Sequence, residues 1–194
     1  MPVVSPTVAA TSLSPSGGPG VAGTAGTSIS VNYPTVTAGQ LLILCAMNGA
    51  PSANSTPSGW TLLNNVNSAA GDTAAATYWR RATGTETGSV TVTHTNTGTA
   101  DVPIAVILAL SNVSSASNPI TSSGTTNNTS ASTTSPAPPT LSPVPASTDL
   151  VLRFYCASVQ NPGAYSSIGT IGGTWTTVLR QWTTTVRPLV TTAP

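Results

Sequence analysis

Few residues of this chain could act as acids or bases. His94 is the only histidine among 194 residues. It continues an alternating segment with Val90 and Val92, so the three side chains are expected on one face of a strand. This pattern favours a histidine packed at the rim of a core over a general base. Serines are abundant, but no G-x-S-x-G motif frames any of them.

The acidic residues are equally scattered. The carboxylates are Asp72, Glu86, Asp101 and Asp149. Asp72 and Glu86 lie in two successive predicted turns, which fall at opposite ends of a strand meander, so a catalytic carboxylate pair is not expected. Calcium-loop spacing is absent, and two cysteines with one histidine do not make a zinc site. We therefore expect no metal, no cofactor and no enzymatic activity.

The two cysteines, Cys45 and Cys156, each lie inside an apolar run. In a reducing compartment this placement predicts buried thiols that pack as small hydrophobic side chains. A disulfide that joins two core strands is the alternative.

One cluster combines aromatic and basic side chains: Tyr78, Trp79, Arg80 and Arg81. Successive residues of a strand point to opposite faces, so one aromatic and one arginine are expected to face outward or into a contact. Aromatic residues and arginine carry much of the energy of interfaces, which makes these four residues candidates for a subunit contact or a sugar-binding patch. The alternative places one aromatic in the core and one on the second face, with the arginines paired to acids.

The elements that must position this cluster are predicted strands. The stretch Gly59 to Thr95 is expected to form a meander of three strands, with Trp60, Leu62 and Val66 on one face of the first. The other expected strands are Thr27 to Tyr33, Gln40 to Asn48, Ala100 to Asn112, Asp149 to Ser158, and one or two around Trp175 to Trp182 and Thr185 to Val190. The unbroken apolar runs in Gln40 to Asn48 and Ala100 to Asn112 indicate central strands. No helical period appears, so we expect an all-β, antiparallel β-sandwich that is jelly-roll-like.

The chain is expected to form one sandwich domain over residues 27–194, preceded by an extended arm. Residues 1–26 are rich in Pro, Gly, Ser and Thr without sustained periodicity, which is typical of an arm that orders only against a neighbour. Residues 113–147 form a long polar loop rich in Ser, Thr and Pro. A loop of this length in a compact domain is usually functional, linker-like or disordered.

Charge is unusually low. Only 5% of the residues are charged and the formal net charge is +1. A basic surface that would bind nucleic acid or an anionic membrane is therefore not expected. So little repulsion between copies, together with many strand-forming threonines, suits a permanent assembly. The start of the sequence lacks the pattern of a secretory signal, and the apolar runs are too short to span a bilayer. We expect a protein made and assembled in a cytoplasm, without a transmembrane segment.

The order of motifs resembles a β-sandwich module found among virion proteins of tailed bacteriophages and prophages. The resemblance covers roughly residues 27–157 and rests on folding positions. The matching positions are Gly39-Gln40-Leu41-Leu42, Pro57 with Gly59-Trp60-Thr61, Tyr78-Trp79-Arg80 with Ala82-Thr83, and Asn118-Pro119-Ile120. It implies a fold and a virion context, and it transfers no catalytic residue.

Two departures from this family pattern matter. The loop before Pro119 lacks the acidic residue often found there, so no metal role is carried over. The chain also stops soon after Trp182, where members of the family usually add an apolar strand that closes the sandwich. A missing closing strand would leave an edge that a neighbouring subunit could fill by strand addition.

The resemblance implies a non-enzymatic structural protein of the virion. We expect a capsid decoration, or cement, protein that stabilises the head lattice through its arm, loop and sheet edges. Its partners would be the major capsid protein or other virion proteins, and the family context suggests a homotrimer. The alternative is a tail or fibre module that binds host surface glycans. An enzyme such as a depolymerase or lysin, and a lectin-like module outside a virus, are less favoured.

Overall fold

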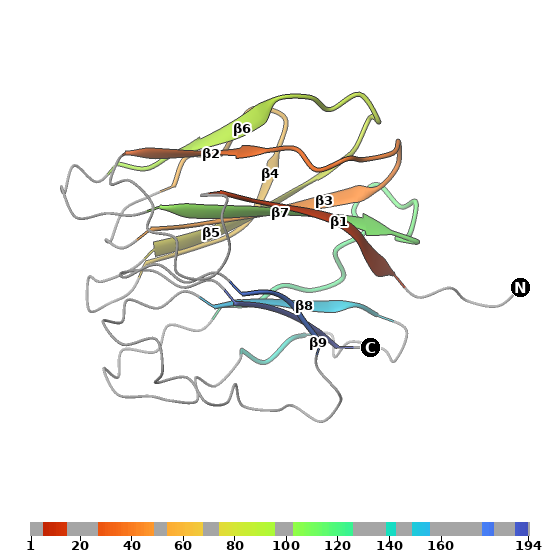
Figure 1. Ribbon diagram of the computed structural model, residues 1–194. Coiled ribbons are helices and arrows are strands. Elements are labelled where there is room, and N and C mark those ends of the chain that lie inside the picture. Colours follow the sequence, from red (N-terminus) through yellow and green to blue (C-terminus); the bar gives the residue numbers. More distant parts are fainter. Residues whose placement is uncertain are drawn as a thin grey trace, which may run out of the picture.

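The computed structural model describes residues 6–14, 27–48, 54–67, 74–95, 103–125, 139–142, 149–155, 176–180 and 189–193. These residues form ten β-strands and no helix. The strands make three antiparallel sheets that lie as three layers (Figure 1). The all-β, antiparallel class expected from the sequence is therefore confirmed.

The middle layer is a five-stranded sheet. Its order is β1 (Thr7–Ser14), β7 (Ile104–Ser111), β3 (Leu41–Asn48), β5 (Ala74–Arg81) and β4 (Thr61–Asn67). Every residue of β3 is buried, as is all of β7 except Ser111, because both faces of this sheet are covered. The continuous apolar runs thus correctly predicted two central strands.

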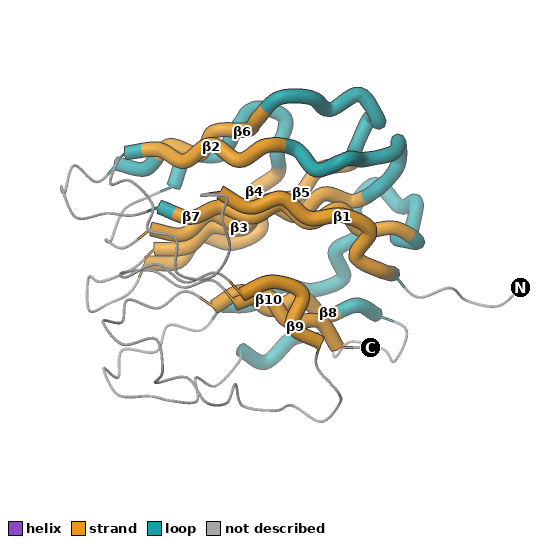
Figure 2. The backbone as a smooth tube through the Cα atoms, viewed as in Figure 1, coloured by secondary structure: helices purple, strands orange, loops and turns teal. Residues whose placement is uncertain are grey.

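A two-stranded sheet of β2 (Ser28–Asn32) and β6 (Ser89–Thr93) covers one face of the middle layer (Figure 2). Val31 of β2 lies opposite Val90 of β6, and both side chains are buried. They belong to the first core, which comprises Val31, Leu42, Leu44, Ala46, Trp60, Ala76, Tyr78, Ala82, Val90, Val92, Ala105, Ile107 and Ala109. The alternation of β6 therefore buries its valines and leaves Ser89, Thr91 and Thr93 exposed.

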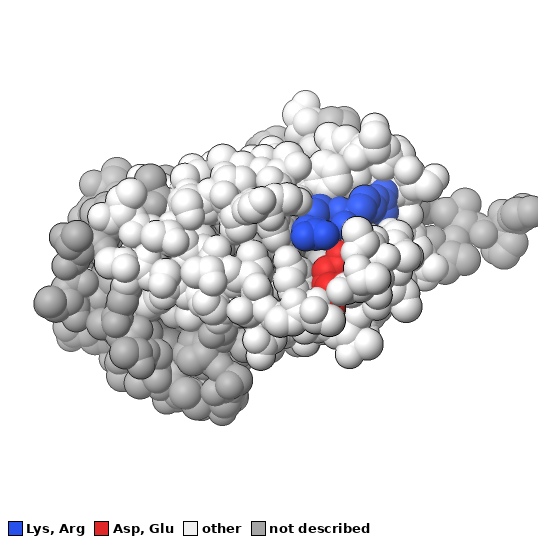
Figure 3. Space-filling view, turned by 90° about the horizontal axis from the view of Figure 1, so that it is seen from above, with Lys and Arg blue, Asp and Glu red and all other residues white. Residues whose placement is uncertain are grey.

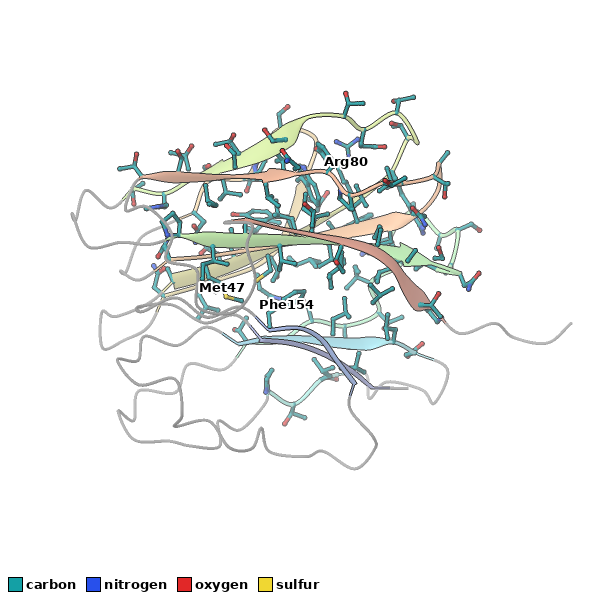
Figure 4. All side chains as sticks on the ribbon, viewed as in Figure 1. Met47, Arg80 and Phe154 are labelled. Carbon is teal, nitrogen blue, oxygen red and sulfur yellow. The ribbon has the colours of Figure 1, made fainter. Side chains whose placement is uncertain are left out.

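A three-stranded sheet lies on the opposite face, in the order β8 (Val151–Tyr155), β10 (Leu189–Ala193) and β9 (Thr176–Arg180). The second core faces this layer and comprises Leu41, Ile43, Cys45, Met47, Ile104, Val106, Leu108 and Leu110. Leu150, Leu152 and Phe154 pack against it from β8 and the residue before it. Figure 4 shows Met47 and Phe154 in the space between these layers, with Arg80 on the other side of the middle sheet.

The expected three-stranded meander is wrong in its third member. β4 and β5 pair as expected, but β6 leaves the middle sheet and pairs with β2. Alternating valines and hydroxyl residues show that β6 has one buried face, but they do not identify the strand beside it. The connection from β5 to β6 therefore passes from one layer to the next.

The expected shared face of Trp60, Leu62 and Val66 is wrong for Val66. A register shift between Leu62 and Asn64 places Leu62 opposite Tyr78, and Val66 opposite Ala75. Tyr78 belongs to the first core and Ala75 packs against the second, so the bulge sends Leu62 and Val66 to opposite faces. Leu62 is 43% exposed.

The two ends of the chain differ from expectation. The first strand is β1, not Thr27 to Tyr33, and it pairs with β7 of the same chain. At the other end, β10 pairs with both β8 and β9. The prediction of a missing closing strand is therefore wrong, because the terminal strand makes its backbone hydrogen bonds within its own chain.

Parts of the long loop contribute to the fold. Val113 and Ile120 pack against the second core, and Pro139 and Leu141 approach Gly124. Cys45 is 1% exposed in the second core, whereas Cys156 and residues 126–138 and 143–147 of the predicted loop lie outside the described residues. Within the described residues, no helix has the length and apolar character needed to cross a bilayer.

Candidate functional site

The four residues singled out from the sequence divide between the two faces of β5. Tyr78 lies opposite Leu44 in the first core, and Trp79 lies opposite Ile43 in the second. Tyr78 is fully buried and Trp79 is half-buried. The predicted opposite faces are confirmed, but a further layer of the same chain covers each face. This arrangement matches the alternative with one aromatic in each core.

The Tyr78 hydroxyl has a structural partner. It donates a hydrogen bond of 2.9 Å to the carbonyl oxygen of Ser55. Burial raises the pKa of Tyr78, and the nearby Cys45 adds to that rise. The phenol therefore stays protonated and holds the segment before β4 on the sheet.

Arg80 sits at the centre of an aromatic cluster. The rings of Tyr33 and Trp60 are stacked, with centroids 6.4 Å apart and planes 14° apart. The guanidinium carbon of Arg80 lies 5.9 Å from the Trp60 ring centroid and 6.0 Å from that of Tyr33. Both distances fall within the range of cation–π attraction. The rings and the charged group thus stabilise one another.

Arg80 also forms an ion pair. Its Nη2 lies 3.0 Å from Oε1 of Glu86, and the side chains are 22% and 3% exposed respectively. Basic and acidic atoms adjoin on the face that carries the β2–β6 layer, with uncharged residues around them (Figure 3). Arg80 and Glu86 therefore agree with the alternative in which an arginine of the cluster pairs with an acid.

Glu86 organises the connection between β5 and β6. Its carboxylate accepts hydrogen bonds from the backbone N–H groups of Thr83, at 2.7 Å, and Gly84, at 2.9 Å, and from the Thr83 hydroxyl at 3.0 Å. Burial alone would raise the pKa of this carboxyl, but the hydrogen bonds outweigh it and lower the pKa below its ordinary value of 4.5. Glu86 is therefore held as a carboxylate in a structural role.

Two turns with the same hydrogen-bond pattern position these side chains. The N–H of Trp60 donates to the carbonyl of Pro57, and Gly59 between them has a φ of 78°. The N–H of Gln40 donates to the carbonyl of Thr37, around Gly39 with a φ of 86°. Glycine adopts this left-handed conformation without a steric cost. The sequence motifs around Gly39 and Gly59 are thus turn signals that place β3 and β4.

Arg81 projects on the opposite face from Arg80 and contacts backbone carbonyls. Its Nη1 donates to Gly39 at 3.1 Å, and its Nη2 donates to Ser114 and to Ala116, the latter at 3.2 Å. One guanidinium thus joins the turn before β3 to the segment after β7.

His94 lies with other buried polar residues. His94 is 3% exposed, and it forms an antiparallel bridge with Asn54, which is 7% exposed. Asn54 accepts a hydrogen bond of 3.2 Å from the fully buried Asn48. The prediction that His94 packs at the edge of the core with Val90 and Val92 is confirmed.

The side chains around Arg80 and Arg81 are held by contacts within the chain rather than exposed for contact with a ligand. Within the part of the chain that the structure describes, no group of three or more His, Cys, Asp or Glu side chains could hold a metal ion. The roles of Tyr33 and Glu86 were missed by sequence reasoning. For Glu86, the available signal was its position between Gly84 and Gly88, where a carboxylate can cap a turn.

In comparisons with known proteins, no protein-family model, no curated protein and no solved structure matches this chain. The resemblance to phage virion modules therefore stays a prediction that rests on the motifs quoted above.

Proposed function

We propose that this protein is a non-enzymatic structural component of a tailed-bacteriophage virion, and most specifically a capsid decoration protein. The observation that carries the proposal is how the charged side chains that the structure describes are used. Arg80 and Glu86 close a connection, Arg81 binds three backbone carbonyls, and Asp149 has an interaction of its own. Charged groups in these roles stabilise a scaffold and are not poised for a reaction.

The surface supports the same proposal. The outward residues of the β2–β6 layer are small and uncharged, and they pair across the strands: Ser28 with Thr93, Ser30 with Thr91, and Asn32 with Ser89. Such a surface can pack against another protein without removing charges from water. The low charge of the chain also suits permanent assembly.

In this proposal the sandwich has jelly-roll-like connections, and its partner is the major capsid protein. Residues 1–26 and 113–147 contact adjacent subunits on the head lattice, although β1 within the first segment also belongs to the sheet. A homotrimer follows from the family context. The candidate subunit contact around Arg80 and Arg81 lies at the end of the middle sheet where the turn around Gly39 adjoins the start of the connection from β5 to β6.

The alternative, a tail module that binds glycans, requires exposed aromatic rings as stacking platforms. Among the aromatic side chains that the structure describes, Trp60 is 6% exposed and Tyr78 is fully buried. Tyr33 and Trp79 are half-buried and pack against the cores. The described aromatics therefore favour the structural role.

Fractionation of virus particles tests the proposal. Heads and tails of the phage that encodes this chain are separated, and the chain is identified by mass spectrometry in each fraction. We expect it with the heads, in a fixed ratio to the major capsid protein. Recovery with tails alone would support the glycan-binding alternative and exclude decoration of the head.

A further inference from the structure

The second face of the middle sheet is an apolar surface covered by a layer from later in the chain. All eight residues of the second core are buried. Their cover includes Val113 and Ile120 from the segment after β7, and Leu150, Leu152 and Phe154 from the β8 region, all of them only partly buried. The central strands are therefore shielded by residues that remain at the surface themselves.

The cover of the first core is tied down by contacts around Ser55. Its N–H donates to the carbonyl of Thr93 in β6 at 2.7 Å, and its hydroxyl accepts from the Thr93 N–H at 3.1 Å. Its carbonyl accepts the hydroxyl of Tyr78 in the middle sheet. Ser55 thus links the β2–β6 layer to the middle sheet independently of the second face.

Arg81 makes the corresponding link on the second face. Its partner in β3 is Leu41, a member of the second core, so its side chain emerges at the end of that face. From there the guanidinium reaches Gly39 on one side and Ser114 and Ala116 on the other. These carbonyls belong to two segments that are separate in sequence, so one side chain joins both of them. Hydrogen bonds from a charged donor are stronger than neutral ones.

We propose that Arg81 is a latch that holds the segment 112–125 on the second face of the middle sheet. Release of the latch uncovers part of this apolar face while the first core and the β2–β6 layer remain folded. The two covers are then separate cooperative units, of the kind that open independently in many folded proteins. This inference does not depend on the proposed virion function.

Cys45 supplies a local probe of such opening. It lies in β3 within the second core and is 1% exposed, so a thiol reagent reaches it only when the cover leaves. Cys156 is replaced by serine so that Cys45 is the only cysteine of the chain. Its alkylation rate without denaturant, followed by mass spectrometry, then measures how often the second face opens.

The test compares Arg81→Ala with Arg80→Ala in the Cys156→Ser background. Both changes remove an arginine from the same end of β5, but Arg80 contacts Glu86 and the aromatic rings on the other face. We expect Arg81→Ala to raise the alkylation rate of Cys45 by about tenfold to a hundredfold, because hydrogen bonds from a charged donor are lost. Arg80→Ala should leave the rate near that of the parent.

Hydrogen exchange by mass spectrometry locates the opening in the same variants. Arg81→Ala should speed exchange in residues 112–125 and leave β2 and β6 protected. Equal alkylation in Arg81→Ala and the parent would overturn the proposal. So would loss of protection in β2 and β6 together with the second face, since the opening would then be global.

Arg81→Lys decides the question if Arg81→Ala does not fold. Lysine keeps the charge and most of the aliphatic side chain. Its single ammonium group cannot bridge the turn around Gly39 and the segment 112–125 as a planar guanidinium does. An intermediate rise in Cys45 alkylation, with β2 and β6 still protected, supports the latch. A rate equal to that of the parent contradicts it.

Discussion

The carboxylate of Glu86 lies 3.0 Å from the guanidinium of Arg80, and this pair closes the connection that carries the chain from the middle sheet to the β2–β6 layer. Arg80 belongs to the end of β5, and Glu86 to the loop before β6. The same carboxylate accepts hydrogen bonds from Thr83 and Gly84. One acid thus joins a strand, a turn and an aromatic cluster.

Replacement of Glu86 by glutamine should make stability less dependent on pH. The folded carboxyl has a lowered pKa, so its contribution is present above the ordinary value of 4.5 and is lost as the pH falls through the folded pKa. We expect Glu86→Gln to reduce the free energy of unfolding by about 1–2 kcal/mol at neutral pH. Below the folded pKa, the difference from the parent should shrink.

Urea unfolding at a series of pH values measures this difference. A gap between parent and variant that stays constant from neutral to acid pH would mean that the Glu86 carboxyl does not have a lowered pKa in the folded protein.

Replacement of Gly84 by alanine should destabilise the fold more than replacement of Gly88. Both glycines have positive φ, 85° and 71° respectively, so alanine is strained at either position. A Cβ at Gly84 would lie 2.8 Å from the backbone nitrogen of Ala38, whereas nothing lies within 4 Å at Gly88. Because backbone cannot yield easily, the extra loss at Gly84 should be about 1–3 kcal/mol.

Thermal and urea unfolding of the two alanine variants give the comparison, with Gly88→Ala as the control for strain alone. Equal losses would show that the loop containing Gly84 does not pack against Ala38 as described.

The difference in burial between Leu44 and Leu62 predicts contrasting costs for their replacement by alanine. Leu44→Ala removes a fully buried side chain from the first core and should cost about 2–5 kcal/mol. Leu62 precedes the register shift and is 43% exposed on β4, an outer strand of the middle sheet. Leu62→Ala should cost less than about 1 kcal/mol. A cost for Leu62→Ala as large as that for Leu44→Ala would contradict the exposed position of Leu62 on β4.

The elements that were predicted correctly have strong local signals. The apolar runs of β3 and β7 require burial on both sides, and the alternation around Val90, Val92 and His94 requires one buried face. The opposite faces of Tyr78 and Trp79 follow from strand geometry alone. These features depend on neighbours in sequence, so sequence reasoning reached them.

The features that were missed depend on partners distant in sequence. The small residues of β1 give little hydrophobic signal, although its pairing with β7 makes it a strand. Alternation in β6 could not reveal that β2 is its partner. Bulges in β1 and β4 leave no mark in the composition, yet they distort the outer strands of an almost uncharged sheet, which discourages edge-to-edge association.

The most direct test of the proposed decoration function uses phage heads assembled without this chain. Purified protein is added to these heads, and the bound amount and the temperature of head disruption are measured. We expect saturable binding at a fixed ratio to the major capsid protein, with heads that withstand a higher temperature once saturated. Absence of binding to heads, or binding to tails or host surface glycans instead, would contradict the account.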